Sequence, residues 1–156
     1  MSRHKNKMPF LFLLIGCILA GCRTAAPLPL LTITVGNEFT LAPGQSAAVT
    51  GTDLTITFNS IVGDDRCPSE VECAVSGSVT VSLSVQQGDD PASEVTLQTF
   101  TDQEGRAPER EFEGMTDRVG VDDYLIRVVR VLPYPQNISK EIKDSDYQVT
   151  LLVTEK

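Results

Sequence analysis

The chain has 156 residues, 41% of them hydrophobic, and a formal net charge of −8. This length suits one ordinary domain with a real core, and a surface this acidic argues against nucleic acid as a partner. The one histidine, His4, lies near the amino terminus, so the rest of the chain excludes Ser-His-Asp or Cys-His catalysis and histidine-ligated catalytic zinc.

The first 21 residues have the pattern of a secretory signal, in which a charged start precedes an apolar run. Three basic residues supply the charge: Arg3, Lys5 and Lys7. The run 10–20 is almost wholly apolar but falls well short of the ~20 residues that a membrane-spanning helix needs. It ends in Leu-Ala-Gly followed by Cys22. This ending resembles the lipobox of bacterial lipoproteins, which implies cleavage before Cys22 and diacylation of its sulfur.

The resemblance to lipoproteins implies a division into three parts. Residues 1–21 are the signal, residues 22–30 are the lipidated cysteine with a proline-containing tether, and residues 31–156 form a single β domain. Two or more acyl chains anchor a protein stably to a membrane, so the domain is expected to face the periplasm or the exterior of the cell envelope. Arg23 favours the outer membrane if the cell has two. A plain secretory signal with an incidental cysteine is the alternative.

The rest of the chain alternates apolar and polar residues over short runs, as strands do. The clearest run is 78–87, with Val79, Val81, Leu83 and Val85 predicted to face inward. In the last run, 147–154, the inward residues are expected to be Tyr147, Val149, Leu151 and Val153. The segment 102–117 is expected to be a loop with one short strand at 110–112, and 138–142 a single helical turn. We predict an all-β fold, an antiparallel sandwich or barrel of about seven to nine short strands. The strands are expected at 31–35, 38–41, 47–50, 54–58, 78–87, 94–101, 124–132 and 147–154.

Two cysteines remain once Cys17 and Cys22 are assigned to the signal and the lipid. Cys67 and Cys73 lie in the turn-rich segment 64–77 and, in an oxidising compartment, are expected to form a disulfide. The chain-entropy model gives such a short loop about 2 kcal/mol of stabilisation. A zinc site is the rival interpretation, but the chain has no second cysteine pair nearby and no histidine to complete four ligands.

The same loop carries the candidate binding residues: Asp64, Asp65, Arg66, Glu70 and Glu72. One interpretation is structural, with an aspartate capping backbone N–H groups or pairing with Arg66. The other is functional, with the carboxylates offering oxygens to a hard cation. The spacing does not match an EF-hand, so the structural interpretation is preferred and no metal or cofactor is predicted.

The segment Asp64-Asp65-Arg66-Cys67-Pro68 is also similar to a group of small uncharacterised bacterial envelope proteins that carry Asp-Ser-Arg-Cys-Pro with a second cysteine nearby. Here Asp65 replaces the serine, and Val75 stands where that group often has a tryptophan. The segments 124–135 and 147–153 resemble the closing strands of the group. The resemblance implies a shared β fold and carries no activity with it.

Loss of the signal would remove three basic residues and leave 10 against 21 acidic ones, a net charge of −11. Such a surface could attract cations, basic proteins or cationic peptides, but solubility alone is the preferred interpretation of the charge. The leading hypothesis is therefore a membrane-anchored, non-enzymatic β domain that binds an envelope protein or has a structural role. One alternative is an inhibitor of an envelope or foreign hydrolase that presents the Cys67–Cys73 loop. Another is a calcium-dependent protein or a carboxylate-based hydrolase.

Overall fold

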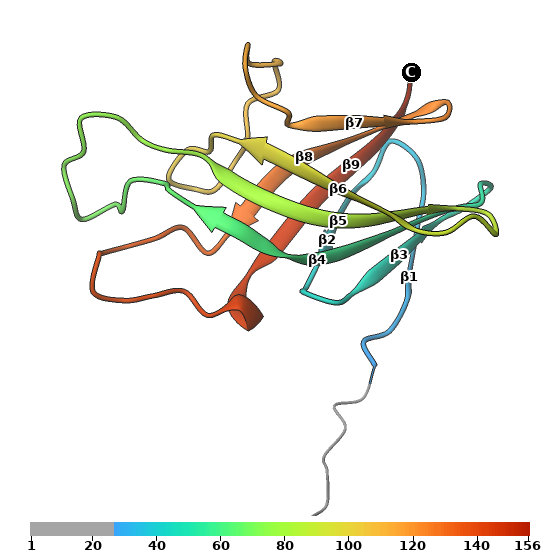
Figure 1. Ribbon diagram of the computed structural model, residues 1–156, viewed down its shortest axis with the longest axis horizontal. Helices are drawn as coiled ribbons and strands as arrows, with labels where there is room; N and C mark the ends of the chain where they lie inside the picture. The colour runs from blue at the N-terminus through green and yellow to red at the C-terminus, as the bar shows by residue number, and fades with distance from the viewer. Residues whose placement is uncertain (1–26) are drawn as a thin grey trace, which may run out of the picture.

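The computed structural model describes residues 27–156, so the predicted signal and Cys22 lie outside the described residues. The described chain folds into two facing β-sheets (Figure 1). Within this range no helix is long and apolar enough to cross a membrane. The elements are β1 (Leu31–Ile33), β2 (Glu38–Leu41), β3 (Ser46–Val49), β4 (Leu54–Asp64), β5 (Val79–Gln87), β6 (Ser93–Thr99), β7 (Arg118–Val121), β8 (Tyr124–Leu132), the 3-10 helix η1 (Asp144–Asp146) and β9 (Gln148–Glu155).

The two sheets form a sandwich and do not close into a barrel. One sheet has the order β1-β3-β4-β5-β6 and the other the order β2-β9-β8-β7. The predicted all-β class is confirmed, and the sandwich is the correct one of its two predicted architectures. The pairing is antiparallel except between β1 and β3, which run parallel. The parallel pair differs from the prediction because β1 and β3 belong to one sheet while the intervening β2 joins the other.

The core lies between the sheets and follows the two-residue period of the strands. The four predicted inward residues of β5, Val79, Val81, Leu83 and Val85, are all buried. Tyr147 and the apolar residues of β9 that alternate with it are buried as well. Burying each large apolar side chain contributes roughly 1.5–3 kcal/mol, so this alternation is what holds the two layers together.

Two local predictions were wrong. Residues 110–112 form no strand; Phe112 is 55% exposed there, and its ring packs edge-to-face with that of Phe100. The strand instead lies at β7, which pairs with β8. Residues 138–142 form no helical turn, and the short helix η1 starts later, at Asp144. In both places a few polar residues carry little periodicity, so contacts with distant strands decide the outcome.

Three long loops meet at one end of the sandwich (Figure 1). They are the β4–β5 loop (65–78), the β6–β7 loop (100–117) and the β8–β9 loop (133–147). The β4–β5 loop is tied to the β8–β9 loop by backbone bonds, from Ser69 N–H to the Pro135 carbonyl at 3.0 Å and from Glu70 N–H to the Gln136 carbonyl at 2.9 Å. The candidate binding residues therefore sit on a loop that a second loop supports.

Candidate functional site

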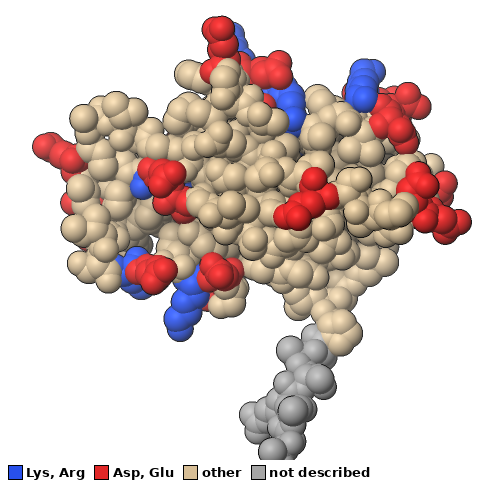
Figure 2. Space-filling model, in the orientation of Figure 1, with Lys and Arg blue, Asp and Glu red and all other residues tan. Residues whose placement is uncertain are grey.

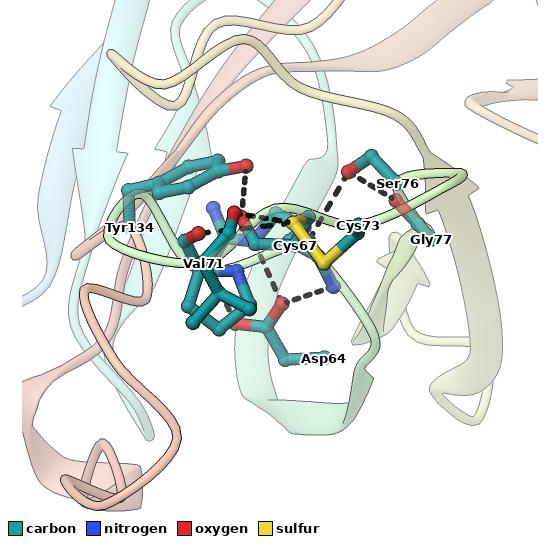
Figure 3. The surroundings of a disulfide bond; sticks show 9 residues. Asp64, Cys67, Val71, Cys73, Ser76, Gly77 and Tyr134 are labelled. Atoms are coloured by element: carbon teal, nitrogen blue, oxygen red, sulfur yellow. Dashed lines mark hydrogen bonds and ion pairs between the residues drawn. A yellow bond between two sulfur atoms is a disulfide. The ribbon is translucent and has the colours of Figure 1, made fainter.

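The disulfide closes the β4–β5 loop on itself. Cys67 and Cys73 are bonded, with their Cα atoms 6.0 Å apart (Figure 3). The predicted pairing is confirmed, and because both thiols are in the bond, neither is available to a zinc ion. The closed segment is seven residues long, from Cys67 to Cys73, and its middle projects away from the sandwich (Figure 1).

Arg66 is the centre of the base of this loop. Its side chain is fully buried, and it forms a two-pronged ion pair with Asp64, from Nε to Oδ1 at 2.7 Å and from Nη2 to Oδ2 at 2.6 Å. The remaining N–H groups donate to the carbonyls of Val131 and Pro133, each at 2.9 Å, and to the Thr101 hydroxyl at 3.5 Å. One guanidinium thus joins the end of β4 to the end of β8.

Two tyrosines complete this network. The Tyr134 ring lies against the Arg66 guanidinium at 5.0 Å, and its hydroxyl donates to the Cys67 carbonyl at 2.7 Å (Figure 3). The Tyr147 hydroxyl donates to Asp64 Oδ2 at 3.0 Å. Burial, and then the adjacent Asp64 carboxylate, raise the pKa of Tyr147 well above its usual value. The hydroxyl therefore stays a donor to Asp64 at any physiological pH.

Sequence reasoning did not find these tyrosines as site residues. Tyr147 was predicted as an inward core residue, which is correct but incomplete. Tyr134 lies between two prolines at the end of β8. An aromatic residue held between prolines is a weak signal of a fixed ring, and nothing local indicates that the ring reaches Arg66.

The structural interpretation of the loop is confirmed for Asp64 and Arg66. Asp64 pairs with Arg66 and also accepts from the Arg66 backbone N–H at 3.3 Å. Asp65, Glu70 and Glu72 are exposed and do not converge with Asp64. Within residues 27–156 no group of three or more His, Cys, Asp or Glu could hold a metal ion. The five predicted loop residues therefore divide into a buried pair and three exposed carboxylates.

The outer part of the loop presents apolar side chains among these carboxylates. Val75 is 82% exposed, and Val71 lies between Glu70 and Glu72. On the neighbouring β8–β9 loop, Ile138 is 83% exposed, and the Asn137 side chain donates to Glu70 Oε2 at 3.3 Å. We call Glu70, Val71, Glu72 and Val75 the loop tip.

A cleft of about 350 Å³ separates the base of the loop from the β8–β9 loop. Its lining includes Asp64, Arg66, Tyr147, Pro68, Lys140 and Ile142. The polar atoms at its floor are already engaged with one another, since both Asp64 oxygens accept from Arg66 or Tyr147. Three exposed charged residues also line the cleft, the basic Lys140 and the acidic Glu141 and Asp144.

Comparisons of the chain with protein-family models, curated proteins and solved structures found no match.

Proposed function

We propose that this protein is a membrane-anchored envelope lipoprotein whose β domain binds a protein partner through the loop tip and catalyses no reaction. One observation carries the binding role: the buried Arg66 fixes the base of a disulfide-closed loop whose tip is exposed. A loop already held in one conformation loses little entropy on binding. Rigid support and exposure together are what a recognition loop needs.

The chemistry of the loop tip favours a basic partner. Glu70 and Glu72 flank the exposed Val71, Val75 is exposed on the same loop, and Asp65 adds a third exposed carboxylate at the loop base. By contrast, the middle of the face formed by the five-stranded sheet carries few charges, and most acidic groups seen from that side lie towards its margins (Figure 2). A partner that presents lysine or arginine around a shallow apolar depression would match the tip, and the net negative charge would speed their encounter.

The absence of catalysis is proposed on two grounds. The chain beyond position 4 has no histidine, the usual activating base. Of the three carboxylates that line the cleft, Glu141 and Asp144 are exposed, and Asp64 is held by Arg66 and Tyr147 and so has no free oxygen to accept a proton from a substrate.

An inhibitor of an envelope or foreign hydrolase is the second candidate. The 82% exposed Val75 on a disulfide-closed loop favours it, because a rigid projecting apolar side chain can fill an enzyme pocket. Inhibition assays against purified envelope hydrolases, with Val75→Asp as the matched variant, separate this role from simple binding. Inhibition that Val75→Asp abolishes would identify an inhibitor.

The anchor is tested on the product that the cell makes. Mass spectrometry of the purified protein is expected to show loss of residues 1–21 and added acyl mass on Cys22. The Cys22→Ser protein should leave the membrane fraction. A native product that starts at Met1, or one that carries no acyl mass, would contradict the anchor.

The binding role is tested by capture of partners from envelope extract with the domain from residue 23 onward. Glu70→Gln with Glu72→Gln is expected to lower the captured amount by about tenfold, since charge pairs at an interface centre contribute strongly. The matched control is Glu38→Gln with Glu155→Gln, an equal charge change at exposed strand positions away from the loop. Equal capture by both double variants would contradict the proposal.

A further inference from the structure

The side of the sandwich formed by β6 and β7 is incompletely closed. β6 is the edge of the five-stranded sheet, β7 is the edge of the four-stranded sheet, and both lie along the same side (Figure 1). At one end β6 meets the loop just before β7, where Gln98 N–H donates to the Thr116 carbonyl at 2.8 Å. Towards Ser93 and Val121 a cleft of about 370 Å³ separates the two strands.

β6 presents free backbone groups along this opening. In an edge strand, every second residue directs its N–H and C=O groups away from the sheet. Gln98 N–H points away from β5, so the backbone groups of Glu94 and Thr96 point away too. Within residues 27–156 these N–H groups have no backbone partner.

The other edges of the sandwich are shorter. β1, β2 and β7 have three or four residues each, and the Lys156 side chain covers Gly120 on β7. β6 has seven residues and pairs with β5 without a bulge. Natural proteins usually protect so long and regular an edge with proline, lysine or a bulge. β6 has none of these.

The cleft beside β6 suits small apolar side chains and positive charge. Four valines line it, Val85 and Val95 from one sheet and Val119 and Val121 from the other. Asp90 and Asp122 are also in the lining, and Glu94 is exposed on β6. A strand laid along β6 would direct alternate side chains towards the valines and the others towards Glu94.

We propose that β6 accepts an extended strand of a partner protein that alternates small apolar and basic side chains. The added strand would pair with Glu94 and Thr96 through its backbone and fill the cleft with every second side chain, as in other cases of strand addition to a sheet edge. A second copy of this chain fits less well, because it would bring the same carboxylates to both sides of the junction. This site depends neither on the lipid anchor nor on the loop tip.

The probe is a synthetic peptide, acetyl-Lys-Val-Lys-Val-Lys-Val-amide, added to the protein as the cell produces it. Hydrogen-exchange mass spectrometry is expected to show slowed exchange in 93–99, because the Glu94 and Thr96 amides gain acceptors. The Glu-Val peptide of the same length should bind at least about tenfold more weakly. A Lys-Val peptide that is N-methylated on every backbone amide should also lose binding, since neither of its edges can donate to β6, and this control leaves the protein unchanged.

The protein-side variants are Thr96→Pro and Thr96→Ala. Because the Thr96 N–H points away from β5, proline removes this N–H without breaking a bond to β5. Edge strands tolerate proline at such positions. Alanine keeps the N–H. Thr96→Pro is expected to lose peptide binding, and Thr96→Ala to keep it. If Thr96→Pro fails to fold, the N-methylated peptide gives the same test. Any of four results would overturn the proposal: no binding of the Lys-Val peptide, equal binding of the Glu-Val peptide, protection from exchange outside 93–99, or a protein that is already dimeric through β6.

Discussion

At the residue scale the central feature is a buried arginine with a complete set of acceptors. Burying a charge is costly unless it is paired and hydrogen-bonded. Arg66 meets this requirement with both Asp64 oxygens and two backbone carbonyls. Because the carbonyls come from β8 and the turn after it, the ion pair stabilises contacts between distant segments as well as the loop itself.

Arg66→Met should destabilise the fold by roughly 3–5 kcal/mol, because it leaves the partly buried Asp64 carboxylate without its charge partner. Urea unfolding measures the loss. Arg106→Met is the matched control, since Arg106 pairs with Asp102 at 3.0 Å on the surface, where both side chains are about half exposed. The control should cost less than about 1 kcal/mol. Similar costs for the two variants would show that the buried pair has no special role.

Tyr147→Phe tests the hydrogen bond to Asp64 through its pH dependence. The raised pKa means that the folded protein keeps the Tyr147 proton where the unfolded chain loses it, above about pH 10. Its contribution to stability is therefore complete below pH 10 and declines as the pH rises further. Tyr147→Phe should cost about 1 kcal/mol at neutral pH and reduce that alkaline decline. Stability curves of the two proteins that stay parallel above pH 10 would refute this.

At the element scale the disulfide loop depends on close packing where its two ends meet. The Gly77 N–H donates to the Asp65 carbonyl at 3.0 Å, and a Cβ on Gly77 would lie 2.6 Å from the Cβ of Asp65. The chain can therefore pass this close to Asp65 only if residue 77 is glycine. In the sequence Gly77 is the last residue of the predicted loop, just before the strand predicted at 78–87. The structure shows why no larger residue fits there.

Gly77→Ala should destabilise the protein by roughly 1–3 kcal/mol, since overpacking forces the backbone apart. The matched control is Gly63→Ala on β4, where a Cβ would meet nothing within 4 Å. That change should stay within about 0.5 kcal/mol. Thermal melts with the disulfide intact compare the two, and an unaltered midpoint for Gly77→Ala would contradict the packing account.

At the scale of the whole molecule the fold is held by the apolar layer between the sheets. Phe58 on β4 is fully buried in that layer, whereas Phe112 in the β6–β7 loop is 55% exposed. The same side-chain type thus occupies the core and the surface of one protein. Comparing substitutions at Phe58 and Phe112 therefore measures how much the apolar layer contributes to the stability of the fold.

Phe58→Ala should lower the free energy of unfolding by roughly 3–5 kcal/mol, through lost burial and the cavity left behind. Phe112→Ala should lower it by less than about 1.5 kcal/mol, because the side chain is half exposed and its aromatic contact is an edge-to-face one with Phe100, with the ring centroids 5.5 Å apart. Chemical denaturation of both variants measures the difference. A Phe112→Ala cost equal to that of Phe58→Ala would mean that the β6–β7 loop belongs to the core.

Much of this architecture could be predicted from the sequence alone. The inward residues of β5 and β9 and the disulfide follow from short-range patterns, as does the possible pairing of an aspartate with Arg66, although the sequence left open whether Asp64 or Asp65 would pair. Strand periodicity is local, two cysteines allow one pairing, and residues two positions apart at a turn are close in any fold. The lipid anchor and the binding role remain predictions.

The tertiary structure decided what depends on distant contacts. It paired β1 with β3 in parallel, placed a strand at β7 instead of 110–112, and brought Tyr134 and Tyr147 to the Asp64–Arg66 pair. It also left the outward N–H groups of Glu94 and Thr96 on the edge strand β6 without backbone partners. None of these features has a local signal, because each arises from the way the two layers face each other, and that arrangement depends on the whole apolar interface.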